Sequence, residues 1–155
     1  MAKARGDNNT IDLLTEWNPP EVAVRFTQPE RVRGSNFAQR ISRAVSEVLK
    51  DCDKSRDEIA AAMSEYAGEE VTKNMLDAYA SMARESHTIT LERAFALLHA
   101  TGDARIFGME LERFDFAVIQ ERYIGAVEDA MIEDQREQLR KSQLAARRRW
   151  KGAAR

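Results

Sequence analysis

The sequence is poor in cysteine, proline and glycine, and it contains no long hydrophobic run. Cys52 is the only cysteine among 155 residues, so no disulfide can form within one chain and we expect a reducing, cytoplasmic setting. No apolar run approaches the roughly 20 residues of a membrane span, and the first residues, MAKARGDNN, lack the apolar core of a signal peptide. Three prolines, all near the N-terminus, and seven glycines leave few places to interrupt helices. We therefore predict an all-α protein without membrane contact.

The sequence also lacks the residue patterns of catalytic and metal sites. His87 and His99 are the only histidines, and no cysteine lies between them, so a zinc-ligand spacing is absent. No nucleophile–base pair, glycine-rich phosphate loop or carboxylate cluster with metal-ligand spacing is present. We expect no enzymatic activity, no metal and no cofactor.

Positive charge is scarce where a nucleic-acid-binding module needs it. The formal net charge of the chain is −2. Residues 35–108 hold nine basic and twelve acidic side chains, whereas residues 109–155 hold ten basic and nine acidic ones. Because lysine and arginine supply most non-specific affinity for DNA by neutralising phosphates, this distribution counts against duplex binding unless positive charge gathers on one face.

The stretch from Ser55 to Gly102 predicts three short helices. Ser55 followed by Glu58 is a capping box, in which a hydroxyl and a carboxylate satisfy the first backbone amides of a helix. Thr72 and Thr90 are each placed to cap the helix that follows, and Gly102 can adopt the left-handed turn that ends the last one. Apolar residues recur three and four positions apart in all three: Ile59 and Met63; Val71, Met75, Leu76 and Tyr79; Leu91, Ala94, Leu97 and Leu98. Short capped helices of this kind are typical of a helix-turn-helix module.

The string DEIAAAM…VTKNMLDAYAS…TLERAFALLHATGD resembles the repressor-type helix-turn-helix of phage regulators. Ile59 and Ala60 match the core of that family's second helix, and Val71–Thr72 match the start of its recognition helix. The connection between them is longer than the family's tight turn, and Ala80–Ser81 replaces the usual Glu-Gly pair. More closely, SRDEIAAAMSE…VTKNMLDAYAS is similar to small early-region DNA-binding proteins of Mu-like transposable phages. The resemblance implies a compact helix-turn-helix bundle, a double-stranded DNA partner and a role in transcription regulation.

A recognition helix reads base edges with residues near its start. In this chain those residues are Thr72, Lys73, Asn74 and Asp77. Asparagine can pair with adenine through two hydrogen bonds, and lysine can reach guanine or phosphate. Asp77 favours the alternative, a capped and solvated helix face, because a carboxylate repels phosphate.

Further basic residues are expected to contact the same DNA. Arg56 and Arg84 lie where loops and helix ends flank a duplex in this module. The only concentrated basic patch is in the tail, at Arg147, Arg148 and Arg149. These arginines serve either as phosphate contacts or as cations that the helix dipole favours at a C-terminus.

We divide the chain into three parts. Residues 1–34 form an extended arm, with a short helix, IDLLTEW, before Pro19–Pro20 and a strand-like segment, EVAVRF, after it. Residues 35–108 form the helix-turn-helix bundle, whose first helix is capped by Ser35 or Asn36. Residues 109–155 form one long helix from Met109 to about Arg149, with a basic tail. A lone strand needs a partner, so the arm lies on the helical body or on a second subunit.

The first half of the long helix carries more apolar surface than one small module can cover. We expect a homodimer interface formed by six side chains: Phe114, Phe116, Val118, Ile119, Tyr123 and Val127. If the chain is monomeric, the arm is the expected cover for this surface.

Two functions fit these observations. The triplet Thr72-Lys73-Asn74 and the family resemblance favour a dimeric, sequence-specific DNA-binding regulator. The acidic balance of residues 35–108 favours an adaptor that keeps the helix-turn-helix shape and binds another phage or host protein instead of duplex DNA. A positive strip over Lys73, Arg84 and Arg56 would favour DNA.

Overall fold

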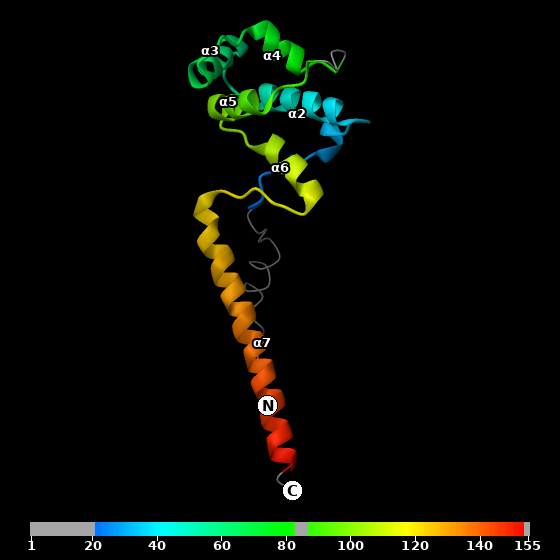
Figure 1. The fold of residues 1–155 in the computed structure, drawn as a ribbon, viewed down its shortest axis with the longest axis vertical. Helices are drawn as coiled ribbons and strands as arrows, with labels where there is room; N and C mark the ends of the chain where they lie inside the picture. The colour runs from blue at the N-terminus through cyan, green and yellow to red at the C-terminus, as the bar shows by residue number, and fades with distance from the viewer. Residues whose placement is uncertain (1–20, 83–86, 154–155) are drawn as a thin grey trace, which may run out of the picture.

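The computed structural model describes residues 21–82 and 87–153, and every regular element within these ranges is helical. The helices of the body are α2 (Phe37–Asp51), α3 (Arg56–Ala67), α4 (Lys73–Tyr79), α5 (Leu91–Thr101) and α6 (Arg105–Leu111). A long helix, α7 (Ile124–Ala153), leads away from the body (Figure 1). Short 3-10 turns are η1 (Pro29–Val32), η3 (Glu112–Phe114) and η4 (Glu121–Tyr123). The predicted all-α fold with a long C-terminal helix is confirmed. None of the described helices has the length and apolar character needed to cross a bilayer.

The caps of α2 to α5 lie where the sequence predicts them. The Asn36 side chain accepts a hydrogen bond from the Gln39 N–H at the start of α2. Ser55 and Glu58 form both hydrogen bonds of the capping box at α3. At the start of α4 and of α5 a threonine side chain accepts one backbone N–H, as Asn36 does at α2. The chain leaves α5 through Gly102, whose φ of 73° lies in the left-handed region that favours glycine.

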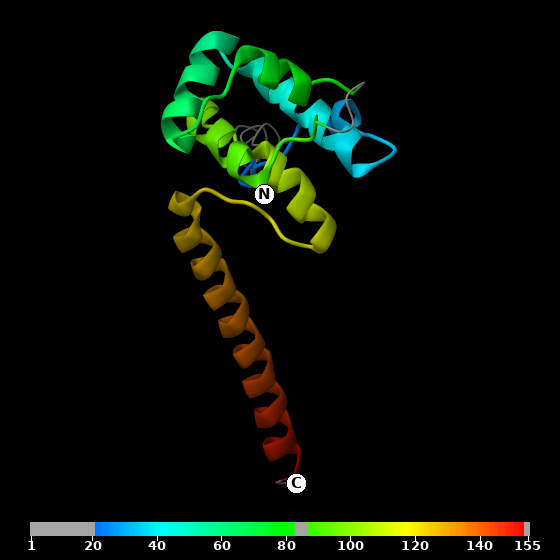
Figure 2. The ribbon, with the colours of Figure 1, turned by 45° about the horizontal axis from the view of Figure 1, so that its top comes forward.

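The core lies where α3 packs along α5 and where α2 meets α4 and α6. Figure 2 shows these helices gathered around one centre, with α7 outside it. The largest fully buried side chains come from four helices: Val45, Val48, Ile59, Met63, Leu76 and Leu97. Two residues of the expected apolar stripes, Phe37 and Leu91, are instead 55% and 68% exposed. They stand at the first turns of their helices, beside an apolar groove between α2, α5 and α6.

The prediction of one unbroken helix from Met109 is wrong. After α6 the chain turns at Asp115, whose φ is 62°, and α7 begins only at Ile124. Between them the backbone pairs with the arm: Ala23 and Ile119 form an antiparallel bridge, and the Val24 N–H donates to the Val118 carbonyl at 2.8 Å. The apolar residues of this segment have helical spacing, but its backbone pairs with the arm instead of forming a helix.

The described part of the arm lies on the helical body, as expected for a lone extended segment. Phe26 is buried, and the Arg105 guanidinium carbon lies 4.7 Å from the centre of its ring. Val24 crosses α6 at Gly108, where a Cβ atom would come within 1.8 Å of the Val24 carbonyl oxygen. The arm can approach α6 this closely only because residue 108 has no side chain. The helix predicted at residues 11–17 lies outside the described residues.

We expect Gly108→Ala to destabilise the protein by about 1–3 kcal/mol, the usual cost of adding a methyl group to a tightly packed site. Urea unfolding measures this change, and faster proteolysis near Val24 would report release of the arm. Gly125→Ala is the matched control, because a Cβ there meets nothing within 4 Å and alanine favours a helix interior over glycine. Equal stability of the two variants would contradict the close approach.

Candidate nucleic-acid interface

The candidate interface is the outer face of α4 together with the start of α3. On its inner side, the seven-residue helix α4 buries Leu76, Ala78 and Tyr79. On its outer side, Lys73, Asn74 and Asp77 are exposed. The Thr72 hydroxyl caps the helix by accepting from the Met75 N–H. The helices α3 and α4 form the end of the molecule that is farthest from the tip of α7 (Figure 1).

The connection from α3 to α4 is held by Ser64. Its hydroxyl donates to the Ala60 carbonyl at 2.8 Å and accepts from the Val71 N–H at 2.8 Å. Val71 is buried, so the end of the connection is anchored in the core. A serine that bonds back to the preceding turn usually competes with its helix, but here the same hydroxyl also fastens the next segment.

Arg93 of α5 links the connection before α4 to the C-terminal end of α4. Its Nε donates to a carboxylate oxygen of Glu69 at 2.7 Å, and its Nη1 donates to the Tyr79 hydroxyl. The hydrogen bond to Glu69 raises the pKa of Arg93. Sequence reasoning missed both Ser64 and Arg93, because each acts on an element other than its own helix.

Carboxylates already pair with the cations of the candidate interface. Arg56 Nη1 lies 3.3 Å from Asp77 Oδ1, and Lys73 Nζ lies 3.6 Å from Asp57 Oδ2. The Arg56 nitrogen is buried without an aligned hydrogen bond, so its contact with Asp77 is mainly one of charge. Partly exposed pairs of this kind contribute about 0–1 kcal/mol. A phosphate could therefore replace the carboxylate at little cost.

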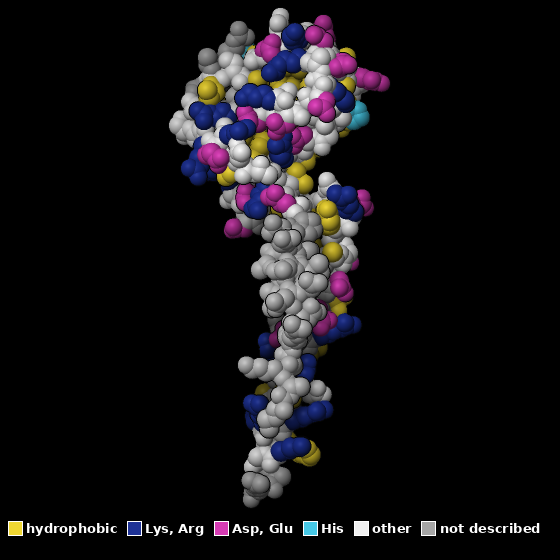
Figure 3. Space-filling model, turned by 180° about the vertical axis from the view of Figure 1, so that it is seen from behind, with side chains coloured by type: hydrophobic (Ala, Val, Ile, Leu, Met, Phe, Trp, Pro, Cys, Tyr) yellow, Lys and Arg dark blue, Asp and Glu magenta, His cyan; other side chains and the backbone are white. Residues whose placement is uncertain are grey.

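The described residues form no continuous positive strip over α3 and α4. Residues 53–81 hold three basic and seven acidic side chains, and Figure 3 shows the two charge types intermixed over the body. Of the three residues expected to form the strip, Arg56 and Lys73 each face a carboxylate. Arg84 lies outside the described residues.

The basic tail is far from α4. Arg147, Arg148 and Arg149 lie near the end of α7, which has 30 residues and is therefore about 45 Å long. In Figures 1 and 2 this helix leads away from the body. One chain thus does not bring the tail and the start of α4 into a single interface.

The six side chains expected at a dimer interface do not share one helix face. The first two, Phe114 and Phe116, flank the turn at Asp115 and are 70% and 65% exposed. The middle two are half-buried where the segment pairs with the arm. The last two lie in η4 and in the first turn of α7. The arm therefore covers part of this surface, as we expected for a monomer.

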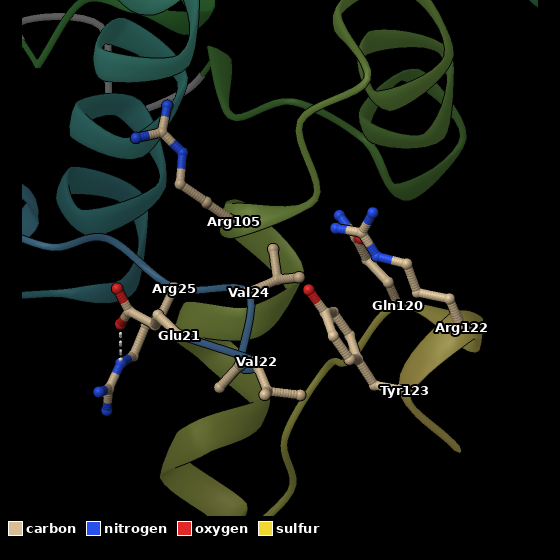
Figure 4. A pocket seen from close by; sticks show the side chains of 9 residues that line it. Glu21, Val22, Val24, Arg25, Arg105, Gln120, Arg122 and Tyr123 are labelled. Atoms are coloured by element: carbon tan, nitrogen blue, oxygen red, sulfur yellow. Dashed lines mark hydrogen bonds and ion pairs between the residues drawn. The ribbon is translucent and has the colours of Figure 1, made fainter. Parts of the chain in front are cut away.

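A cavity of about 230 Å³ separates the arm from residues 120–123. Figure 4 shows the charged side chains that line this cavity, and each of them interacts with a neighbouring residue. Arg25 donates to Glu21 at 2.7 Å, and Arg105 points toward α2. The Arg122 guanidinium lies 4.8 Å from the centre of the Tyr123 ring. Because these groups do not converge on the cavity, we assign it no ligand.

Comparison with protein-family models, with curated proteins and with solved structures finds no match to this chain. The relation to phage regulators therefore stays a prediction, as do DNA binding and dimer formation. Within residues 21–82 and 87–153, no three histidine, cysteine, aspartate or glutamate side chains lie close enough together to hold a metal ion.

If the outer face of α4 meets phosphate, removing the Asp77 carboxylate should strengthen binding. Asp77→Asn frees Arg56 for one phosphate contact, so the affinity for any duplex should rise severalfold. The slope of log affinity against log salt should steepen by about 0.9. Fluorescence anisotropy between about 50 and 200 mM salt measures both quantities.

Glu121→Gln is the control for Asp77→Asn. It removes the same charge from η4, which contacts α7 rather than α4. Identical gains in the two variants would mean that net charge, and not a contact at Arg56, governs binding.

Proposed function

We propose that this protein binds double-stranded DNA sequence-specifically through α3 and α4, and that it regulates transcription as a homodimer of the phage type. The observation that carries the proposal is the exposure of Lys73 and Asn74 at the start of a helix whose other side is locked in the core. Base readout requires a helix that presents its first residues to the major groove and does not shift. Ser64 and Arg93 hold α4 at its two ends and supply that rigidity.

Each residue of the outer face has a distinct proposed role. Asn74 pairs with adenine through its amide, Lys73 reaches guanine or phosphate, and the Thr72 hydroxyl contacts phosphate. A good base contact contributes about 1–3 kcal/mol of discrimination, whereas an exposed ion pair contributes about 0–1 kcal/mol. Asn74 is therefore the expected source of discrimination, and exchanging the Lys73–Asp57 pair for a phosphate contact costs little.

Asn74→Ala should cost about 1–3 kcal/mol for a cognate duplex and leave binding to random duplex nearly unchanged. The cognate duplex is obtained by selecting binders of the purified protein from a random pool, and mobility-shift titration then compares the variants. Lys73→Ala is the contrasting variant, since loss of a phosphate contact weakens binding to all sequences alike. Equal cognate affinity of Asn74→Ala and the wild type would refute the proposed readout.

The basic tail should add affinity without specificity. Removing residues 147–155 should weaken binding to every duplex by a similar factor and flatten the dependence on salt. Titrations of cognate and random duplex at two salt concentrations measure this. An unchanged salt slope would assign the arginines to helix stabilisation or to protein contacts instead.

A second candidate function is an adaptor that binds another protein. The apolar groove between α2, α5 and α6 favours it, since its volume is about 400 Å³ and Phe37, Leu91 and Leu111 on its rim are exposed. The acidic balance of residues 53–81 favours it as well. The selection experiment separates the two functions, because an adaptor enriches no sequence from a random duplex pool even at low salt.

A further inference from the structure

The long helix α7 has no partner within the described chain. Residues 124–152 are all exposed, and among the described elements the helix contacts chiefly the adjoining turn η4. Most helical stability in proteins comes from packing of an apolar face, so a helix of 30 residues without packing calls for a partner.

The apolar side chains of α7 form one stripe. Six of them fall within about 140° of the helix circumference at 100° per residue: Ile124, Val127, Met131, Ile132, Leu139 and Trp150. Gln135, Ser142 and Ala146 fall within the same range, and so do two charged residues, Glu128 and Arg149. Leu144 lies on the opposite side of the helix and is not part of it.

Acidic and basic side chains occupy different halves of α7. Residues 124–139 hold five acidic side chains and one basic one, whereas residues 140–153 hold six basic side chains and no acidic one. In Figure 3 the acidic side chains of the helix lie nearer the body and the basic ones nearer the tip. The helix dipole favours such charges only in the first and last turns. It does not account for Asp134, Glu137, Arg140 and Lys141, which lie near the middle.

We propose that α7 pairs with α7 of a second copy of this chain in antiparallel orientation. This orientation places the acidic half of each helix against the basic half of the other, twice per dimer, while parallel pairing would oppose like charges. A pair centred between residues 138 and 139 sets Met131 opposite Ala146 and Glu128 of one helix opposite Arg149 of the other. Along one edge the same register brings Asp134 of one helix beside Lys141 of the other.

The pairing does not rest on DNA binding. It is a property of α7 and is measured without nucleic acid, so a monomeric wild type would remove the homodimer from the proposed function and leave DNA recognition by α4 to its own tests. If both hold, the basic tail of each copy reaches back toward the body of the other.

Sedimentation equilibrium of the full chain tests the pairing. We expect the wild type to be a dimer, Met131→Asp to be monomeric and Leu144→Asp to remain a dimer. The two variants are matched, because both residues are apolar side chains of α7 with 63% and 47% exposure and only Met131 lies in the stripe. Thermal melting should be the same for both, since α7 lies outside the core. A monomeric wild type, or a dimer that survives Met131→Asp, would overturn the proposal.

Disulfide cross-linking tests the orientation. In a Cys52→Ser background, Met131→Cys and Ala146→Cys should each fail to cross-link to an identical copy, whereas a mixture of the two should form a disulfide-linked dimer. Cross-linking of Met131→Cys to itself would show a parallel pair and contradict the proposal.

Charge exchange gives an independent measurement of the same orientation. Glu128→Lys and Arg149→Glu should each raise the dimer dissociation constant by about two- to tenfold, and the double variant should restore it. In a parallel pair the two positions are about 32 Å apart, so the double variant would show no rescue.

Discussion

The guanidinium of Arg105, at the start of α6, holds together α6, the end of α2 and the arm. The positions of the other elements depend on these contacts. It pairs with Asp103 just before α6, donates to Asp51 at the end of α2 at 2.8 Å, and covers the ring of Phe26 in the arm. The hydrogen bond to Asp103 raises the pKa of Arg105. Arm and α6 are thereby held together, and Gly108 lets them touch. The arm in turn pairs with residues 118–119, and this pairing sets the point at which α7 leaves the body.

This arrangement separates two surfaces of different chemistry. The end formed by α3 and α4 presents a rigid helix start, but its cations are paired with carboxylates and its charge is negative overall. The helix α7 carries the basic cluster Arg147, Arg148 and Arg149 and an apolar stripe, but it lies away from α4. In the proposed function, specificity and non-specific affinity would therefore reside on different elements.

Local signals predicted the body, and contacts between distant residues determined the rest. Ser55, Thr72, Thr90 and Gly102 act on backbone groups within a few residues, so the ends of α3, α4 and α5 could be inferred from sequence. Exposure at the start of α4 followed from its cap and its apolar spacing. The break at Asp115 could not be inferred, because the segment after it owes its extended form to the arm. The pairing of Arg56 with Asp77 could not be inferred from the sequence either, since it depends on how α3 and α4 pack.

Nitrogen–proton NMR spectra of the full chain, recorded while a selected duplex is added, test recognition by α4 most directly. The Asn74 side-chain amide and the backbone amides of Thr72 and Lys73 should shift, while the amides of α6 should stay in place. Shifts confined to α7, or no shift at any duplex concentration, would contradict a role of α4 in DNA recognition.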